Sequence, residues 1–233
     1  MRLEARTVPV CELDGTAILR MRQLMEDHYD GVSSAQFLAD LHAKQWVILL
    51  SDAGTLCGFS TQMLFDHEVA GRSVKVLFSG DTIIRKDRWG SLALPLAWGQ
   101  LVLSLRATFP DRDLYWLLTS KGYKTYRFLP VGFREFYPTH TTPTPPFEKE
   151  LLDSVARLRF GDAFDPDAGV LRAEAGSQRL RPGVADVDAH RLRDPHVSYF
   201  HTRNPGHARG DELVCLARLH PDNLTPYILR QLG

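Results

Sequence analysis

The stretch VKVLFSGDTIIRKDRWGSLALPLAWGQLVLSLRATF, residues 74–109, decides the fold of this chain. Its first part, residues 74–84, is rich in β-branched and aromatic side chains with partial alternation, which predicts a strand. Residues 92–107 carry apolar side chains at the spacing of a buried helix face. Between them, small and basic residues can gather backbone N–H groups and the positive end of the helix dipole around a phosphate. An ordinary strand-to-helix turn with a solvated basic edge would explain the same residues.

The composition is that of a globular protein, with 44% hydrophobic and 24% charged residues among 233. Basic and acidic side chains balance at 28 each, so no overall charge would attract nucleic acid or an anionic membrane. No apolar run approaches the roughly 20 residues of a membrane-spanning helix, and the first residues lack the apolar segment of a secretory signal. The three cysteines have neither a disulfide nor a metal-site spacing. We therefore expect a reduced, cytoplasmic protein.

The order of patterns predicts a mixed α/β sheet flanked by helices over residues 1–138, as β-α-α-β-β-β-α-β-α-β. Its last members are a buried strand at 114–119, a helix over 121–129 that Pro130 ends, and a strand at 133–137. A connector rich in Thr and Pro begins at Thr139 and opens a C-terminal extension, residues 139–233, which we expect to pack on the first domain.

Within this extension, residues 147–160 have the spacing of an amphipathic helix. Residues 161–195 are poor in large apolar side chains, so we expect a long surface excursion without regular elements there. The remaining expected elements are strands at 197–201 and 212–219 and a last helix near 224–232.

Arg88-Trp89-Gly90-Ser91-Leu92-Ala93, after the predicted strand, resembles the signature Arg/Gln-x-x-Gly-x-Gly/Ala of the GNAT superfamily of acyl-CoA-dependent N-acyltransferases. The match lies at Arg88 and Ala93, while Ser91 stands where the first glycine is expected. A second landmark of the family is an aromatic residue four positions before Gly-Phe. Phe128 and Gly132-Phe133 supply that frame, with Phe in place of the usual Tyr. The resemblance covers roughly residues 5–138.

The resemblance implies a GNAT-like fold and the transfer of an acyl group from a thioester to an amine of a small molecule or peptide. The co-substrate would be acyl-CoA, with its pantetheine along the strand and its pyrophosphate on the turn. The implied donor-binding residues are Thr82, Ile83, Arg88, Trp89, Gly90, Ser91, Leu92 and Ala93. The Cβ of Ser91 would lie near the phosphates. An acyl-carrier protein, whose phosphopantetheine lacks the nucleotide, therefore stays open as the donor.

Ser79-Gly80-Asp81 interrupts the apolar strand. Glycine in a strand marks a bulge or the close approach of a ligand, and a carboxylate there needs a partner or a function. Asp81 is therefore our candidate general base, the alternative being an acid paired with a structural Arg. Tyr126, or less favoured Tyr123, is the candidate acid for the leaving thiolate. A buried tyrosine with a satisfied hydroxyl is the alternative.

The remaining candidate residues have weaker support in the sequence. His67 in a turn is a second candidate base, and exposed turn residues explain it equally. His201, His207, Asp211 and Glu212 follow no metal-binding spacing, so we expect no metal. Cys57 and Cys215 lie in apolar runs and are expected in the core. The main alternative to an enzyme is a catalytically inactive binding or regulatory module of the same fold, favoured by Ser91 and the missing Tyr. An independent interaction function of residues 139–233 is a third possibility.

Overall fold

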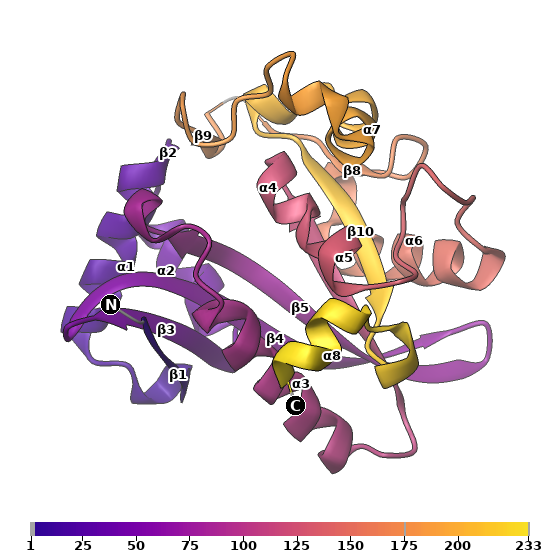
Figure 1. The fold of residues 1–233 in the computed structure, drawn as a ribbon, viewed down its shortest axis with the longest axis horizontal. Helices are drawn as coiled ribbons and strands as arrows, with labels where there is room; N and C mark the ends of the chain where they lie inside the picture. Colours follow the sequence, from indigo (N-terminus) through magenta and orange to yellow (C-terminus); the bar gives the residue numbers. More distant parts are fainter. Residues whose placement is uncertain (1–2, 175, 233) are drawn as a thin grey trace.

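The computed structural model describes residues 3–174 and 176–232, and one large sheet runs through these segments (Figure 1). Its strand order is β1-β3-β4-β5-β6-β10-β8-β7. The pairing is antiparallel throughout except between β5 and β6, which run parallel. The predicted mixed sheet flanked by helices is confirmed. The strands are β1 (Glu4–Pro9), β3 (Trp46–Asp52), β4 (Thr55–Val69), β5 (Arg72–Ile84), β6 (Asp113–Ser120), β7 (Phe164–Asp165), β8 (Val170–Leu171) and β10 (Glu212–Arg218).

Helices cover both faces of this sheet. The core clusters divide between the two faces, so neighbouring residues of β6 point to opposite sides: Trp116 and Leu118 pack with α3, and Tyr115 and Leu117 pack with α6. The helices on the Trp116 side are α3 (Ala93–Thr108), α4 (Tyr123–Tyr126), α5 (Phe128–Gly132), α7 (Pro195–Arg203) and α8 (Pro226–Leu232). Those on the other side are α1 (Gly15–His28), α2 (Ser34–His42) and α6 (Pro146–Phe160). Short 3₁₀ turns occupy Val10–Glu12, Lys86–Arg88, Gly161–Ala163, Arg191–Arg193, His207–Arg209 and Pro221–Asn223.

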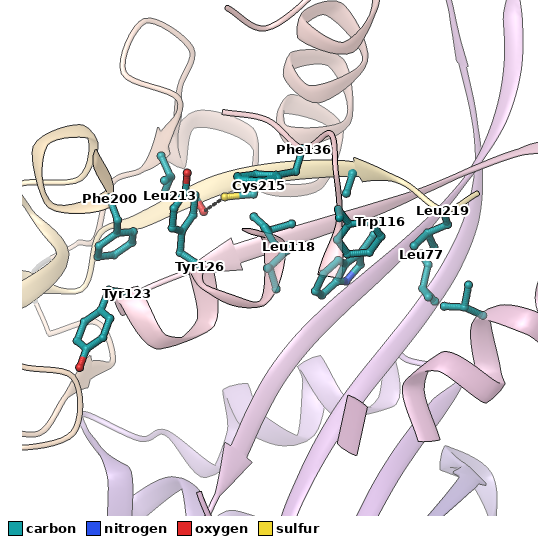
Figure 2. Packing of buried hydrophobic residues seen from close by; sticks show 14 of the residues in the cluster. Leu77, Trp116, Leu118, Tyr123, Tyr126, Phe136, Phe200, Leu213, Cys215 and Leu219 are labelled. Carbon is teal, nitrogen blue, oxygen red and sulfur yellow. Dashed lines mark hydrogen bonds between the residues drawn. The ribbon is translucent and has the colours of Figure 1, made fainter. Parts of the chain in front are cut away.

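The last third of the chain enters the sheet itself. β10 pairs antiparallel with β6, from Leu213 opposite Ser120 to Arg218 opposite Tyr115, and Figure 1 shows it as a long yellow arrow across the molecule. Its alternate residues Leu213, Cys215 and Ala217 join the same core as Trp116 (Figure 2). Both Cys57 and Cys215 are buried, as expected.

Four local predictions were wrong. Residues 121–129 form two short helices, and Pro130 lies inside α5 rather than ending a helix, because it is the third residue there and its N–H would have no helical partner in any case. Residues 133–137 form only isolated bridges, Phe133 with Leu224 and Tyr137 with Leu216, because β10 takes the place beside β6.

Residues 197–201 belong to helix α7, not to a strand. Asp194 caps this helix by accepting the N–H of His196 at 2.9 Å, and Pro195 occupies the first helical position. The excursion over 161–195 is also not devoid of regular elements. It contains β7 and β8, and its β9 (Arg179–Leu180) pairs with β2 (Tyr29–Asp30) at the end of α1. Among the helices of the described segments, none has both the length and the apolarity to cross a bilayer.

Candidate functional site

β5 and β6 pair only over their first halves. The parallel ladder joins residues 74–79 of β5 to residues 113–118 of β6, and then the two strands diverge. A cavity of about 690 Å³ opens at the divergence, lined by Asp81 and Thr82 on β5 and by Thr119 and Lys121 at the end of β6. We call it the main cavity. It lies at the carboxyl ends of two parallel strands, where ligands of α/β proteins bind.

A β-bulge places Asp81 at this opening. Ser79 pairs with Gln62 and Thr82 with Ser60, so Gly80 and Asp81 together lie opposite Thr61. The position of Gly80 excludes a side chain: a Cβ there would lie 2.6 Å from Thr61 Oγ1 and 2.8 Å from Cε of Lys44. The predicted reason for a glycine in this strand, a bulge, is therefore present.

A chain of buried hydrogen bonds holds the bulge across three strands. Trp116 Nε1 donates to Ser79 Oγ at 2.9 Å, and Ser79 Oγ donates to Gln62 Oε1 at 2.8 Å. Gln62 Nε2 donates to Ser60 Oγ at 2.8 Å, and the hydroxyls of Ser60 and Thr82 lie 2.7 Å apart. Since Ser60, Gln62 and Ser79 are buried, this network fixes the backbone on which Asp81 sits.

The surroundings of Asp81 suit a base. Burial, together with the negative charge of Asp40, raises the pKa of this carboxyl to about 6, although the cations of Lys121 and Lys44 oppose the rise. Lys44 is bound to Asp40 with 2.5 Å between Nζ and Oδ2, and Lys121 Nζ lies 3.1 Å from Glu212 Oε1. Among the salt bridges of the described residues, none joins Asp81 to an Arg, so the alternative of a structural Asp–Arg pair is excluded there.

Tyr29 is a cavity residue that the sequence did not reveal. It follows the last residue of α1 and lines the main cavity together with Asp81 and Lys121. Burial and the negative charges of Asp81 and Glu212 raise the pKa of its hydroxyl, which therefore stays protonated. Its backbone pairs with Leu180 in the β2–β9 ladder, so the excursion from the C-terminal third holds it in place.

The arginine side chains of the turn before α3 are bound to acidic side chains of the protein itself. The guanidinium of Arg88 binds Asp52, and Arg85 Nε donates to Asp87 Oδ1 at 2.6 Å. Trp89, Gly90, Ser91 and Leu92 line the main cavity, whereas Arg88 and Ala93 do not. The N–H of Ala93 donates to Ser91 Oγ at 3.2 Å.

The backbone of β5 presents two residues to the cavity. The N–H of Arg85 donates to Cys57 O at 2.9 Å, so alternation along an antiparallel pair directs the N–H and C=O groups of Ile83 toward β4. Those of Thr82 and Ile84 then point away from β4, on the open side. Trp89 Nε1 donates to Ile84 O at 2.8 Å, in agreement with this alternation. Thr82, Ile83 and Ile84 line the main cavity, and of the two residues that the resemblance implied, Thr82 and Ile83, it is Thr82 whose backbone polar groups face the open side.

Cations gather at the α3 end of the main cavity. Lys124 Nζ lies 3.3 Å from the centroid of the Trp89 ring and donates to Val184 O at 2.6 Å. Arg191 lines the same cavity, whereas Lys86 does not. Burial lowers the pKa of Lys124, and the positive charges of Arg191 and Lys86 add to this effect. Such a group of cations favours a bound anion. Local patterns in the sequence do not reveal it, because its members come from three distant segments.

The other predicted residues lie elsewhere. Tyr126 is buried among Phe136 and Phe200 (Figure 2), and its hydroxyl donates to Pro138 O at 2.9 Å. It does not line the main cavity, whereas Tyr123 does. The role of Tyr126 as an acid therefore stays a prediction from the sequence.

The histidines that the sequence singled out, His67, His201 and His207, do not line this cavity, and His67 lies in β4 rather than in the predicted turn. His67 Nε2 lies 2.8 Å from Ser154 Oγ on α6, and Nδ1 of His201 lies 3.2 Å from Nε2 of His207. Over residues 3–174 and 176–232, no three His, Cys, Asp or Glu side chains are grouped to hold a metal ion.

No protein-family model matches the chain, and no curated protein does. Solved structures similar to it include a probable N-acyltransferase from Enterococcus faecalis, with 12% identity and a TM-score of 0.42 over 55% of this chain and 32% of that one. Thus the match spans about a third of the Enterococcus protein. The GNAT family N-acetyltransferase YhbS of Escherichia coli, solved with CoA, has 16% identity and a TM-score of 0.38 over 55% and 69% of the two chains. A Trypanosoma brucei acetyltransferase has 16% identity and a TM-score of 0.37 over 61% and 99%.

These structures are described as a probable N-acyltransferase, a GNAT family N-acetyltransferase and an acetyltransferase. With TM-scores below 0.5 they carry no conclusion about the activity of this chain. That activity has to be argued from its own residues.

Proposed function

We propose that this protein is an acyltransferase that moves an acyl group from a thioester donor to an amine of a small molecule or peptide. The observation that supports it best is the position of Asp81 on the bulge, at the point where β5 and β6 diverge into the main cavity. Ionised at neutral pH with a pKa of about 6, this carboxylate is suited to take a proton from an amine inside a half-buried site.

The donor would lie extended beside β5. The open N–H and C=O groups of Thr82 accept a pantetheine arm as a sheet edge accepts a peptide strand. Its phosphate end would lie at Lys124, Arg191 and Lys86 rather than at Arg88, whose guanidinium already binds Asp52. Acyl-CoA and the acyl-phosphopantetheine of a carrier protein both carry a phosphate at that end.

The transfer needs two proton movements. The amine nitrogen attacks the thioester carbon and loses its proton to Asp81, while the carbonyl oxygen gains negative charge beside the N–H of Thr82. The C–S bond then breaks, and the departing thiolate takes a proton from solvent, because the raised pKa of the Tyr29 hydroxyl makes it a hydrogen-bond donor to the sulfur rather than an acid. The products are an amide and a free thiol.

Residues 139–233 would complete the acceptor side of this site. Leu180, Val184 and Glu212 come from this segment and line the main cavity. We therefore propose that the C-terminal extension shapes the acceptor pocket, as an addition to the core over residues 1–138.

One observation favours a non-catalytic binding module instead. Arg85 and Arg88, the cations of the turn, are bound to Asp87 and Asp52, which removes charge from the position where the family resemblance implies a pyrophosphate. A module of this kind would bind a donor without turnover.

Thermal melting with thioester donors tests the proposal. CoA, acetyl-CoA, a long-chain acyl-CoA and an acylated carrier protein are added in turn, and a ligand at a hundredfold excess over its Kd stabilises the fold by about 2.7 kcal/mol. We expect a rise in Tm with at least one donor. Release of free thiol in the presence of a panel of amines then separates enzyme from module.

Asp81→Asn is the matched variant. We expect it to bind the same donor and to lose about 10²–10⁴-fold in turnover. The absence of a melting shift with every donor would contradict a thioester site. Binding without thiol release in the wild type with any amine would favour the module.

A further inference from the structure

A second cavity, of about 120 Å³, lies on the α3 face of the sheet. Its walls come from α3, β6 and α8, and they are almost entirely apolar, with Trp98, Val102, Leu118 and Ile228 among them. Ser60, Ser79 and Thr82 also line it, but their hydroxyls already bond within the network of the bulge. We call it the apolar cavity.

The apolar cavity adjoins the main cavity at the reacting centre. Several residues line both, and Thr82 is one of them. The shared residues beside it are Leu92, Pro95, Thr125, Phe128 and Gly132. A donor whose thioester lies against Thr82 therefore has an apolar space next to its acyl carbon.

We propose that the apolar cavity receives the acyl chain of the donor, and that the preferred donor is a medium-chain acyl thioester of about five to seven carbons. This inference rests on the proposed acyltransferase function. An apolar cavity of roughly 150 Å³ in a protein stays dry and accommodates benzene, a molecule of six carbons. The volume of about 120 Å³ here thus suits about four to six methylene and methyl groups beyond the thioester.

Chain length is the direct test. Dissociation constants are measured by calorimetry for the C2, C4, C6, C8 and C12 acyl-CoA thioesters with the full-length chain. Each methylene group that enters an apolar site contributes about 0.8 kcal/mol, which is about fourfold in affinity. We expect the affinity to rise by about this factor per methylene up to C6 or C8 and then to level off or fall.

Two substitutions at Val102 change the cavity in opposite directions. Val102 lies in α3, is 9% exposed and lines the apolar cavity but not the main one. Val102→Phe fills the space, and we expect the C6 donor then to bind no tighter than the C2 donor. Val102→Ala enlarges it, and we expect the optimum to move toward longer chains by one or two carbons.

Leu105→Ala is the control for stability. Leu105 lies in the same helix, is 6% exposed and lines neither cavity, so its truncation lowers Tm without a change in the chain-length profile. If acetyl-CoA binds as tightly as the C6 and C8 donors, or the Val102 variants alter all donors equally, the apolar cavity does not hold the chain, while the acyltransferase proposal stands. If no donor of any length binds the folded protein, both proposals fail.

Discussion

Lys121 Nζ and Glu212 Oε1 lie 3.1 Å apart, so an ion pair joins the residue after β6 to the first residue of β10. Both side chains line the main cavity. Burial opposes the charge of Lys121, but Glu212 outweighs it and holds the pKa of Lys121 above its usual value. The charge environment of Asp81 is therefore set by two segments that are almost a hundred residues apart in the sequence.

Substitutions of Lys121 and of Glu212 should shift the pH profile of activity in opposite directions. Because Asp81 must be ionised to accept a proton, kcat/KM should rise with pH through about 6. Lys121 lowers the pKa of Asp81 and Glu212 raises it. Lys121→Met should therefore move the acidic limb of the profile to higher pH, and Glu212→Gln should move it to lower pH. Two shifts in the same direction would exclude Asp81 as the titrating base.

Asp81 should also lower the stability of the protein at neutral pH. Its pKa of about 6 in the fold lies above 3.8, so the folded state holds this proton more tightly than the unfolded state does. Folding loses up to about 3 kcal/mol as pH rises from about 4 to 6, and this loss persists above pH 6.

Asp81→Asn, which cannot ionise, should therefore unfold at higher denaturant concentration than the wild type at pH 7.5. Urea titrations at several pH values check this. The gap should shrink below pH 6 and close near pH 4, and a gap that stays constant across this range would mean that ionisation of Asp81 is not its cause.

Gly80→Ala should damage the bulge. The new Cβ would lie 2.6 Å from Thr61 Oγ1 and 2.8 Å from Cε of the fully buried Lys44 side chain. Overpacking of this kind costs about 1–3 kcal/mol. The double variant with Thr61→Ala removes one of the two clashes and should recover part of that loss in thermal melts. Gly15→Ala, where a Cβ meets nothing within 4 Å, is the matched control and should melt close to the wild type.

Two cations compete for the role of phosphate ligand, and substitution separates them. Lys124→Met removes a member of the cluster near Arg191 and Lys86, so we expect the affinity for CoA to fall by about tenfold, a typical loss for a charged hydrogen bond. Arg88→Met should change it little, because Arg88 is bound to Asp52. Pantetheine without phosphate serves as the control ligand and should bind both variants alike. A large loss in Arg88→Met alone would return the phosphate to the turn before α3.

The parts of the fold that local patterns determine could be predicted from the sequence. The strand and helix of residues 74–109 and the bulge at Gly80 leave signals within a few residues. The pairing of β10 with β6 does not, because it depends on contacts between residues 113–120 and 212–218. The predicted strand at 133–137 was wrong for that reason.

The same distinction between local and long-range signals applies to the residues of the site. Asp81 stands out in the sequence because an acid and a glycine interrupt an apolar strand, whereas Thr82 was named only from the family resemblance, and both line the main cavity. Tyr29 and Glu212 could not be predicted, since each lies at the end of an element and reaches the cavity only through long-range packing. Helix α7 is a different case, because Asp194-Pro195 is a typical helix start and therefore a local signal for this helix.

The β2–β9 ladder binds Tyr29 to the excursion that partly covers the main cavity. Ion pairs of Asp30 with Arg179 and Arg181, at 3.6 and 3.3 Å, reinforce it, and the N–H of Arg181 donates to His28 O at 2.9 Å. The excursion cannot lift away from α1 without breaking these bonds. Opening of the cavity on this side would therefore also release the backbone of Tyr29, and the rate of amide exchange at residues 179–181 would report how often these bonds break.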